Sequence, residues 1–506
     1  MGALPNPQPA PPSLRLLPGA GAPKGPSGPA RGRVASASAW TLGSMGVMSL
    51  LRLVSQMVLT HLCLPEHFGV VTTMRVFMTF VEMVSDMGIR NAVISHPRAE
   101  EPRFLGTAFS VQFVRGLCMW LLTCLVAWPV ATLYDEPLLL WLLPIAGLES
   151  IENGLLSVRA YVAERRMKLA VPTLLDVLAL TISVGASVVW ACFYPGPWAL
   201  ALGPLIGGST RALVSHLWYR SERPPLCWDK DIARELFGYS RWILGSTTVS
   251  FVAQQFHVLY LAKFLSKGVL GVYGVAWNLC AQATKPMTAL ANRVIIPHLA
   301  EAHRRSPEEL DRAVQRSVGG FLPACLLLCL GAGLFAPAMF DLFYDASFAD
   351  GGEMGELFAI VVWFMILQHV PRCVLLSVGD SRGVARMAAW NAGLTVVGIV
   401  AGYAVDGGSI TGAILGNALG NVAGCWVGWR AMRAHALHLG RAMSAYSAGF
   451  VALLALGGFA TEEFARRGVL AESWASVSVT TALSLPLTFW VWRGTVAPLL
   501  ARRARA

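Results

Sequence analysis

The chain has 506 residues, of which 55% are hydrophobic and 14% charged, and its mean hydropathy is +0.55. Because soluble domains carry about 25% charged residues, this composition excludes an ordinary soluble enzyme and indicates an integral membrane protein. The formal net charge of +11 does not predict a nucleic-acid partner, since the basic residues lie mainly in short segments between apolar stretches.

The N-terminal segment differs from the rest of the chain. Residues 1–39 are rich in Pro, Gly and Ala, and they contain basic residues but no acidic one. This composition predicts a disordered cytoplasmic tail. The segment has no apolar core followed by a cleavage site, so we do not interpret it as a signal peptide.

Apolar stretches of bilayer-spanning length follow one another through the rest of the sequence. Such stretches are typical of transmembrane helices, which satisfy their backbone hydrogen bonds internally. The predicted fold is an all-α polytopic membrane protein with about 14 transmembrane helices. The predicted helices are 40–63, 68–95, 104–133, 137–160, 169–194, 197–219, 240–263, 269–297, 317–341, 355–379, 384–405, 408–430, 443–461 and 473–492.

The predicted loops differ in charge between the two sides of the membrane. With the N-terminus inside, only Lys267, Arg466 and Arg467 fall in outer loops, and the other basic residues of the loops face the cytoplasm. The positive-inside rule then predicts that both termini are cytoplasmic. The outer segment 341–356 carries acidic residues and no basic one, and we interpret it as a solvated loop rather than a metal site.

The cysteines predict neither a metal site nor a disulfide framework. Most of the ten cysteines lie inside apolar stretches, and no C-x-x-C pair occurs. We expect them to pack as small apolar residues, and no cofactor is predicted.

Two turns of the chain resemble each other. Residues 64–71 read LPEHFGVV and follow the first predicted helix, whereas residues 266–273 read SKGVLGVY and follow the seventh. Repeats offset by six helices run in the same direction, and transporters often place substrate between two such halves. The predicted organisation is a tail (1–39), an N-lobe of helices 1–6 (40–219), a cytoplasmic linker (220–239), a C-lobe of helices 7–12 (240–430), and helices 13–14 with a basic tail (431–506).

Charged side chains occur at bilayer depth in the first half. Each costs about 2.5–3.5 kcal/mol on insertion scales, so each needs a partner or water. Arg75, Thr79, Glu82 and Asp86 recur at a spacing that places them on one helical face. The acidic residues have two open interpretations. They could form ion pairs with the basic residues, or they could bind a coupling proton or sodium ion. The basic residues are Arg52, Arg75 and Arg115, and the candidate coupling residues are Glu82, Asp86, Glu149 and Asp176.

The second half has cations without an obvious partner. Asn278, Gln282 and Lys285 share one helical face, and Lys285 and Arg372 have no acidic residue at membrane depth nearby in sequence. An unpaired cation at depth is better explained by a wet cavity that meets anions. We therefore predict a partly cationic central cavity for an anionic headgroup such as a phosphate. Its candidate binding residues are Arg52, Arg75, Arg115, Asn278, Gln282, Lys285 and Arg372.

Four short segments resemble a known family of membrane proteins. Residues 60–69 read THLCLPEHFG, 85–89 read SDMGI, 270–278 read LGVYGVAWN and 295–299 read IIPHL. In these segments the chain resembles the polysaccharide-biosynthesis membrane proteins, the lipid-linked oligosaccharide flippases of the multidrug/oligosaccharidyl-lipid/polysaccharide exporter superfamily. The resemblance extends over about residues 40–430 by arrangement.

The resemblance implies both a fold and a function. It implies two six-helix lobes plus two C-terminal helices, which alternate access to a cavity between the lobes. The implied cargo is an oligosaccharide on an anionic polyprenyl pyrophosphate, moved from the inner to the outer leaflet of a bacterial plasma (inner) membrane for surface polysaccharide biosynthesis. By position and chemistry, the cations that would meet the pyrophosphate are Arg52, Arg75, Arg115 and Lys285.

Several alternatives follow from the same residues. A multidrug/cation antiporter of the same superfamily would need an acidic cavity, which the cations at depth disfavour. A membrane-embedded glycan polymerase or ligase would need a catalytic motif or a large outer loop, and neither is found, so no enzyme is predicted. A non-transporting scaffold would not need the polar residues that share one helical face in several predicted helices.

The expected partners are membrane lipids and polysaccharide polymerase machinery, and a monomer is expected because one chain can form the cavity.

Overall fold

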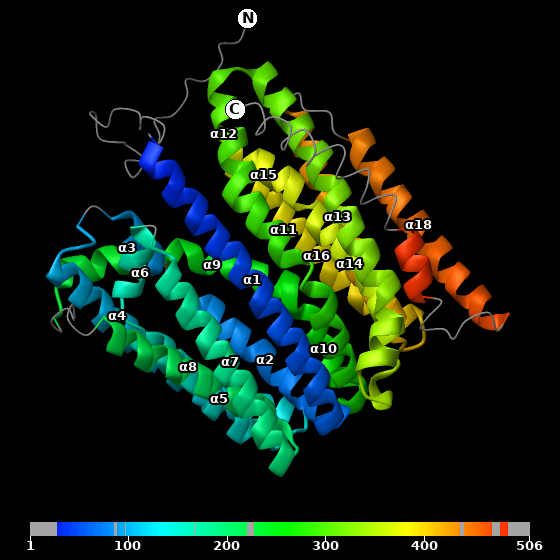
Figure 1. Ribbon diagram of the computed structural model, residues 1–506, viewed down its shortest axis with the longest axis horizontal. Coiled ribbons are helices and arrows are strands. Elements are labelled where there is room, and N and C mark those ends of the chain that lie inside the picture. The colour runs from blue at the N-terminus through cyan, green and yellow to red at the C-terminus, as the bar shows by residue number, and fades with distance from the viewer. Residues whose placement is uncertain are drawn as a thin grey trace, which may run out of the picture.

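The computed structural model describes residues 28–85, 89–96, 98–166, 168–219, 227–435, 440–467 and 476–483. These residues are almost entirely helical, and no strand occurs among them. Figure 1 shows two groups of helices that lie side by side. We call the first group, α1 to α8, the N-lobe and the second group, α10 to α18 together with the C-terminal part of the preceding helix α9, the C-lobe.

The N-lobe helices are mostly long enough to cross a bilayer. Their bounds are α1 (Gly28–Leu62), α2 (Pro65–Ser85), α3 (Ile89–Ser95), α4 (Pro102–Leu133), α5 (Leu139–Leu155), α6 (Arg159–Arg165), α7 (Ala170–Phe193) and α8 (Pro197–Trp218).

The C-lobe contains both long and broken helices. It begins within α9 (Lys230–Phe264), and its other elements are α10 (Lys267–Ala281), α11 (Thr284–Leu290), the π-helical turn η3 (Ala291–Ile295), α12 (Ile296–Arg305), α13 (Pro307–Phe343), the 3₁₀ turn η4 (Ala346–Phe348), α14 (Gly351–Leu367), α15 (His369–Ser377), α16 (Ser381–Val405), α17 (Ile410–Arg433) and α18 (Gly440–Arg466).

All of the predicted stretches contain helix within the described residues, which agrees with the predicted polytopic all-α fold. Eight helices there are long and apolar enough to cross a membrane, and α5 with α6, bent by 60°, would make nine. The other predicted stretches contain α2, α8, α9, α10 and the helical residues 476–483. These helices are too short or insufficiently apolar to meet the same criterion. Polar and charged side chains in α2, α8 and α9 and the short length of α10 are the reason.

The linker helix begins earlier than expected. Helix α9 starts at Lys230 rather than at 240, because Asp229 accepts hydrogen bonds from the backbone N–H groups of Asp231 and Ile232 and so caps it. Its first turns bury Ile232 and Leu236 in a cluster with α3, α4 and α6. This amphipathic segment therefore packs on protein. Residues 220–226 of the predicted linker lie outside the described residues.

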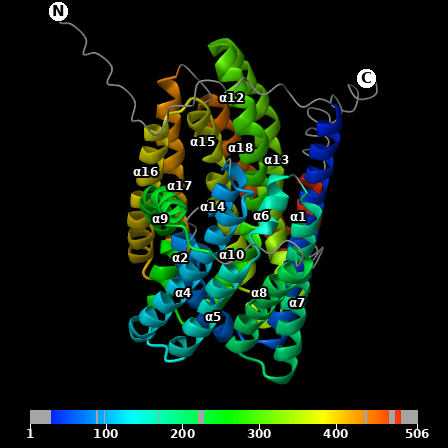
Figure 2. The same cartoon turned by 90° about the vertical axis from the view of Figure 1, so that its left-hand side faces the viewer.

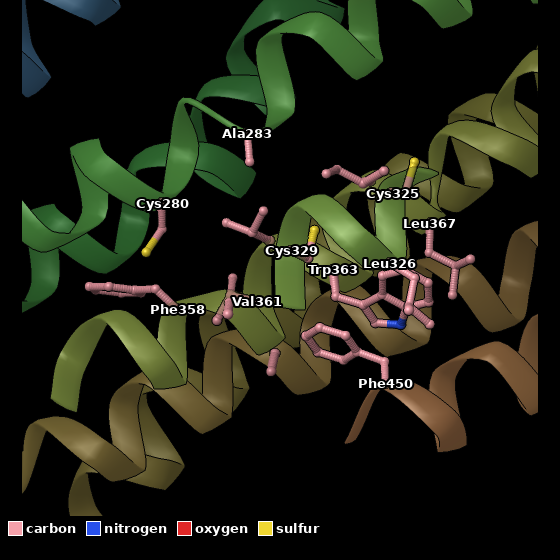
Figure 3. Packing of buried hydrophobic residues seen from close by; sticks show 14 of the residues in the cluster. Cys280, Ala283, Cys325, Leu326, Cys329, Phe358, Val361, Trp363, Leu367 and Phe450 are labelled. Atoms are coloured by element: carbon pink, nitrogen blue, oxygen red, sulfur yellow. The ribbon is translucent and has the colours of Figure 1, made fainter. Parts of the chain in front are cut away.

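Each lobe has its own apolar core. In the N-lobe, α1, α2, α5 and α8 meet around buried side chains such as Met74 and Leu142. The larger C-lobe core includes five buried cysteines, Cys280, Cys325, Cys329, Cys373 and Cys425. Figure 3 shows Cys280, Cys325 and Cys329 among Phe358, Val361 and Trp363, so they pack as small apolar residues.

The helices after residue 431 extend the C-lobe core. Phe450 of α18 stacks on Trp363 of α14 with 4.9 Å between the ring centroids. Ser476 donates a hydrogen bond to the Leu334 carbonyl oxygen of α13. These contacts attach the segment to the C-lobe face away from the N-lobe (Figures 1 and 2).

Candidate functional site

A cavity of about 560 Å³ lies between the lobes. Helices α1, α2, α7 and α8 of the N-lobe form one wall, and α9 and α10 form the other. The lobes diverge from a shared end near α10 towards α3 and α6 on one side and α12 and α15 on the other (Figure 1). The polar side chains of the wall are Arg52, Ser55, Gln56, Thr72, Arg75, Thr79, Ser183, Ser187, Gln255, Trp277 and Asn278.

The charge of this wall is positive. Arg52 of α1 and Arg75 of α2 line the cavity, and none of its described lining residues is acidic. Both arginines lie about ten residues from the ends of α1 and α2 that meet at the turn 63–64, which is about 15 Å along a helix. Each cation is therefore about half a bilayer thickness away from that turn.

An ion pair with Glu149 holds the side chain of Arg75. One of its guanidinium nitrogens lies 3.5 Å from a carboxylate oxygen of Glu149 on α5, and 38% of the arginine side chain is exposed against 12% of the glutamate side chain. Glu82, one turn further along α2 than Thr79, interacts electrostatically with both Glu149 and Arg75. Two of the predicted coupling residues therefore surround an arginine that reaches into the cavity.

The predicted second-half residues occupy three locations, and Gln282 and Lys285 are not among the residues that line either cavity. Asn278 lines the interlobe cavity and donates to the Gly274 carbonyl oxygen at 2.9 Å. Lys285 donates to the Gln282 amide oxygen at 2.9 Å and is near enough to Arg52 for the two positive charges to interact. Arg372 lines a separate cavity inside the C-lobe.

The remaining predicted residues do not line the interlobe cavity. Arg115 of α4 lies outside its wall. Asp176 of α7 forms an ion pair with Arg211 of α8 at 2.7 Å between nitrogen and oxygen. Asp86 lies outside the described residues. Within the described part of the chain, no group of three or more His, Cys, Asp or Glu side chains is arranged to hold a metal ion.

The two similar turns of the sequence contact each other at one end of the cavity. A Cβ atom on Gly69 would overlap the backbone of Lys267, and a Cβ atom on Gly271 would overlap the backbone of Pro65. Gly69 corresponds to Gly271 in the two turns, and Pro65 corresponds to Lys267. The contact is therefore two-fold symmetric, as expected if repeated halves meet around an axis between them.

Polar contacts between the lobes reinforce this end. Lys263 of α9 binds Asp135 at 2.9 Å, and Lys267 of α10 binds Glu136. Tyr134 donates to the Leu259 carbonyl oxygen at 3.0 Å. The cavity is thus closed on the side where the α4–α5 turn and the α9–α10 turn meet.

Comparison with known proteins identifies the family. Residues 58–346 match the model of a family described as polysaccharide biosynthesis protein, and the match includes the interlobe contact and the cavity-lining helices α2, α7, α8, α9 and α10. The chain belongs to this family.

The named relatives have low sequence identity to this chain. The chain is 23% identical over 267 residues to the amylovoran biosynthesis protein AmsL of Erwinia amylovora, and the match covers 52% of this chain and 67% of that one. It is 22% identical over 315 residues to the lipopolysaccharide biosynthesis protein WzxC of Escherichia coli K12, covering 61% of this chain and 64% of that one. Among solved structures, the lipid II flippase MurJ in an inward closed conformation is similar with a TM-score of 0.68 at 11% identity, covering 91% of this chain and all of that one. That structure shares the fold.

Sequence reasoning missed several polar residues of this family member. Arg211 is the partner of Asp176, and its position inside the apolar stretch 197–219 was the available signal. His257 and Tyr273 hydrogen-bond to each other at 2.7 Å. His257 lines a cavity inside the C-lobe, and Tyr273 is next in sequence to Gly274, which lines the interlobe cavity. Their pairing depends on the packing of α9 against α10.

Proposed function

We propose that the protein is a flippase that moves a polyprenyl-pyrophosphate-linked oligosaccharide from the inner to the outer leaflet of a bacterial plasma membrane. The observation that carries this proposal is the composition of the interlobe cavity wall. Two arginines line the cavity, and none of its described lining residues is acidic. A pyrophosphate is a dense anion, and guanidinium groups bind phosphate oxygens through charge-assisted hydrogen bonds.

The ion pair of Arg75 is compatible with this role. Its nitrogen–oxygen distance to Glu149 is long for a hydrogen bond, and the guanidinium offers five donors. Glu149 can therefore hold one side of Arg75 while the other donors meet phosphate oxygens. Lys285, close to Arg52, adds a further cation near the wall.

The closed end of the cavity supports a loading direction. We propose that both termini are cytoplasmic, as the charges of the loops predict, so that the contact between Gly69 and Lys267 closes the outer side. The diverging ends of the lobes then face the cytoplasm, where lipid-linked cargo is loaded. Opening of the glycine contact and closure of the inner side would complete alternating access.

A drug/cation antiporter is the less favoured transporter. Phe68 and Trp277 line the wall, but cationic cargo would also favour acidic groups there, and the described wall carries two arginines and no acidic residue. Since both walls belong to one chain, we propose that a monomer transports, and that it delivers its cargo to polymerase machinery at the outer face.

Deletion of the gene in the native host tests the proposal. Lipid-linked oligosaccharide is expected to accumulate in the inner leaflet, with loss of surface polysaccharide. Complementation with Arg52→Ala or Arg75→Ala should fail to restore transport, because each lost charge-assisted contact weakens phosphate binding by about 1.5–3 kcal/mol, or roughly 10- to 100-fold. Arg430→Ala is the control, since Arg430 lies over Trp426 away from the cavity. Unchanged glycans with increased sensitivity to cationic drugs would contradict the proposal.

A further inference from the structure

A second cavity of about 410 Å³ lies within the C-lobe. Helices α9, α10, α11, α14, α15, α16 and α17 contribute to its wall, and Trp277 lines both this cavity and the interlobe one. Its volume falls in the range of small-molecule sites. We call this cavity the C-lobe compartment.

Amide side chains form one wall of the C-lobe compartment. Gln368, at the break between α14 and α15, donates to the Asn421 side-chain oxygen at 2.7 Å, and Asn391 of α16 donates to Gln368 at 3.0 Å. Asn421 donates to the Asn417 carbonyl oxygen one turn earlier on α17 at 3.0 Å. Asn391, Asn417 and Asn421 are each at least 92% buried. Such a network fixes the orientation of its donors and acceptors.

Two histidines add buried polar atoms that have no partner among the described residues. The His257 Nδ1 atom contacts the Tyr273 hydroxyl at 2.7 Å, whereas its Nε2 atom is buried and has no hydrogen-bond partner in the described part of the chain. His257 is only 1% exposed and belongs to the wall of the compartment. His369 contacts Thr288 through Nε2 at 3.1 Å, and its Nδ1 atom is likewise buried without a hydrogen-bond partner within the described ranges. Buried polar atoms in native proteins normally have a partner, so these two indicate water or a ligand.

The chemistry of the wall favours an uncharged polar ligand. Arg372 is the one side chain with a fixed charge among the described lining residues, and none of them is acidic. The amides and imidazoles provide donors and acceptors in the same space. A sugar hydroxyl is both donor and acceptor, so a carbohydrate can satisfy this mixture, and Trp277 adds apolar surface to the same wall.

We propose that the C-lobe compartment binds the sugar that is attached to the pyrophosphate of the cargo. This inference rests on the proposed function, in which Arg52 and Arg75 bind the pyrophosphate. In such a lipid the first sugar is bonded directly to the pyrophosphate. A sugar subsite must therefore adjoin the cationic cavity, and Trp277 is the residue that borders both spaces. The compartment would contribute to selection of the glycan, while the arginines would recognise the part common to all cargoes.

Binding measurements on the full-length protein in lipid nanodiscs test the subsite. The probes are undecaprenyl pyrophosphate, the lipid-linked oligosaccharide extracted from the deletion host, and the free oligosaccharide released from that extract by mild acid. Asn421→Leu removes the centre of the amide network, and Ala388→Trp fills the compartment without removing a hydrogen bond. Ser447→Ala is the matched control, because Ser447 accepts from the buried Trp363 indole at 3.2 Å and does not line the compartment.

The wild type and the control should bind the lipid-linked oligosaccharide at least tenfold more tightly than undecaprenyl pyrophosphate. Both compartment variants should lose that preference and keep their affinity for undecaprenyl pyrophosphate within twofold. An equal loss for both lipids, or no loss for either, would overturn the subsite. Binding of free oligosaccharide that depends on Asn421, without binding of undecaprenyl pyrophosphate, would keep the subsite and refute the pyrophosphate proposal.

Discussion

Gly271 of α10 packs against the backbone of Pro65 of α2 so closely that a Cβ atom on the glycine would overlap the proline carbonyl group. The corresponding contact between Gly69 and Lys267 repeats this arrangement from the other lobe. Both glycines are needed because only hydrogen fits between the two helices. This contact joins the lobes at the end proposed to face outward.

Gly271→Val is therefore expected to favour opening of the outer end. An overpacked contact costs about 1–3 kcal/mol, which shifts a two-state equilibrium by about 5- to 150-fold. We expect transport to fall about tenfold or more and a cysteine at Gln56 to react faster with a reagent added outside. Gly43→Val is the control, because no atom lies within 4 Å of a Cβ built on Gly43. Slower outside labelling in Gly271→Val would contradict this assignment of the outer gate.

Glu149 is expected to orient Arg75 rather than to carry a coupling ion. In Glu149→Gln the amide oxygen can still accept from Arg75, so affinity for undecaprenyl pyrophosphate should fall only a few-fold. In Arg75→Ala it should fall about 10- to 100-fold. Binding in nanodiscs and transport with and without a pH gradient measure the two roles. Loss of the response to the gradient in Glu149→Gln, with binding intact, would instead identify Glu149 as a coupling residue.

Asp176 is expected to stabilise the N-lobe through its ion pair with Arg211. Asp176→Asn should lower the melting temperature of the purified protein, since a hydrogen bond to a charged group contributes about 1.5–3 kcal/mol. The swapped pair Asp176→Arg with Arg211→Asp should restore most of the stability and the transport. If the swap restores stability but abolishes transport driven by an ion gradient, Asp176 has a coupling role.

The interlobe cavity is expected to contain water. In a variant without native cysteines, Gln56→Cys and Asn278→Cys should react with a water-soluble maleimide, because both positions line the cavity. Leu125→Cys on α4 should not react, although Leu125 is 74% exposed, because that surface is expected to contact lipid. Absence of reaction at both cavity positions would contradict a wet cavity.

The membrane class and the helix positions could be read from local sequence. Apolar stretches of bilayer length predict helices because the backbone must satisfy its hydrogen bonds within lipid, and helices occupy these stretches in the described residues. The repeated turns at 64–71 and 266–273 also indicated related halves, because glycine and small residues at a helix start are a local feature. The number of helices that meet a membrane-spanning criterion was less predictable, since polar interlobe helices such as α2 and broken helices such as α10–α11 depart from the apolar pattern.

The partners of the charged residues were decided by tertiary structure. Helical spacing placed Arg75 and Glu82 on one face of α2, but it could not specify that Glu149 of α5 lies behind Arg75. Nor could it separate Arg372 from the interlobe cations, or bring Gln368, Asn391 and Asn421 together from three segments. The sequence by itself determined the membrane class, the helices and the family resemblance, because these depend on composition and on spacing along one helix. Which polar faces line each cavity depends on how helices from distant parts of the chain pack, and only the tertiary structure decided that.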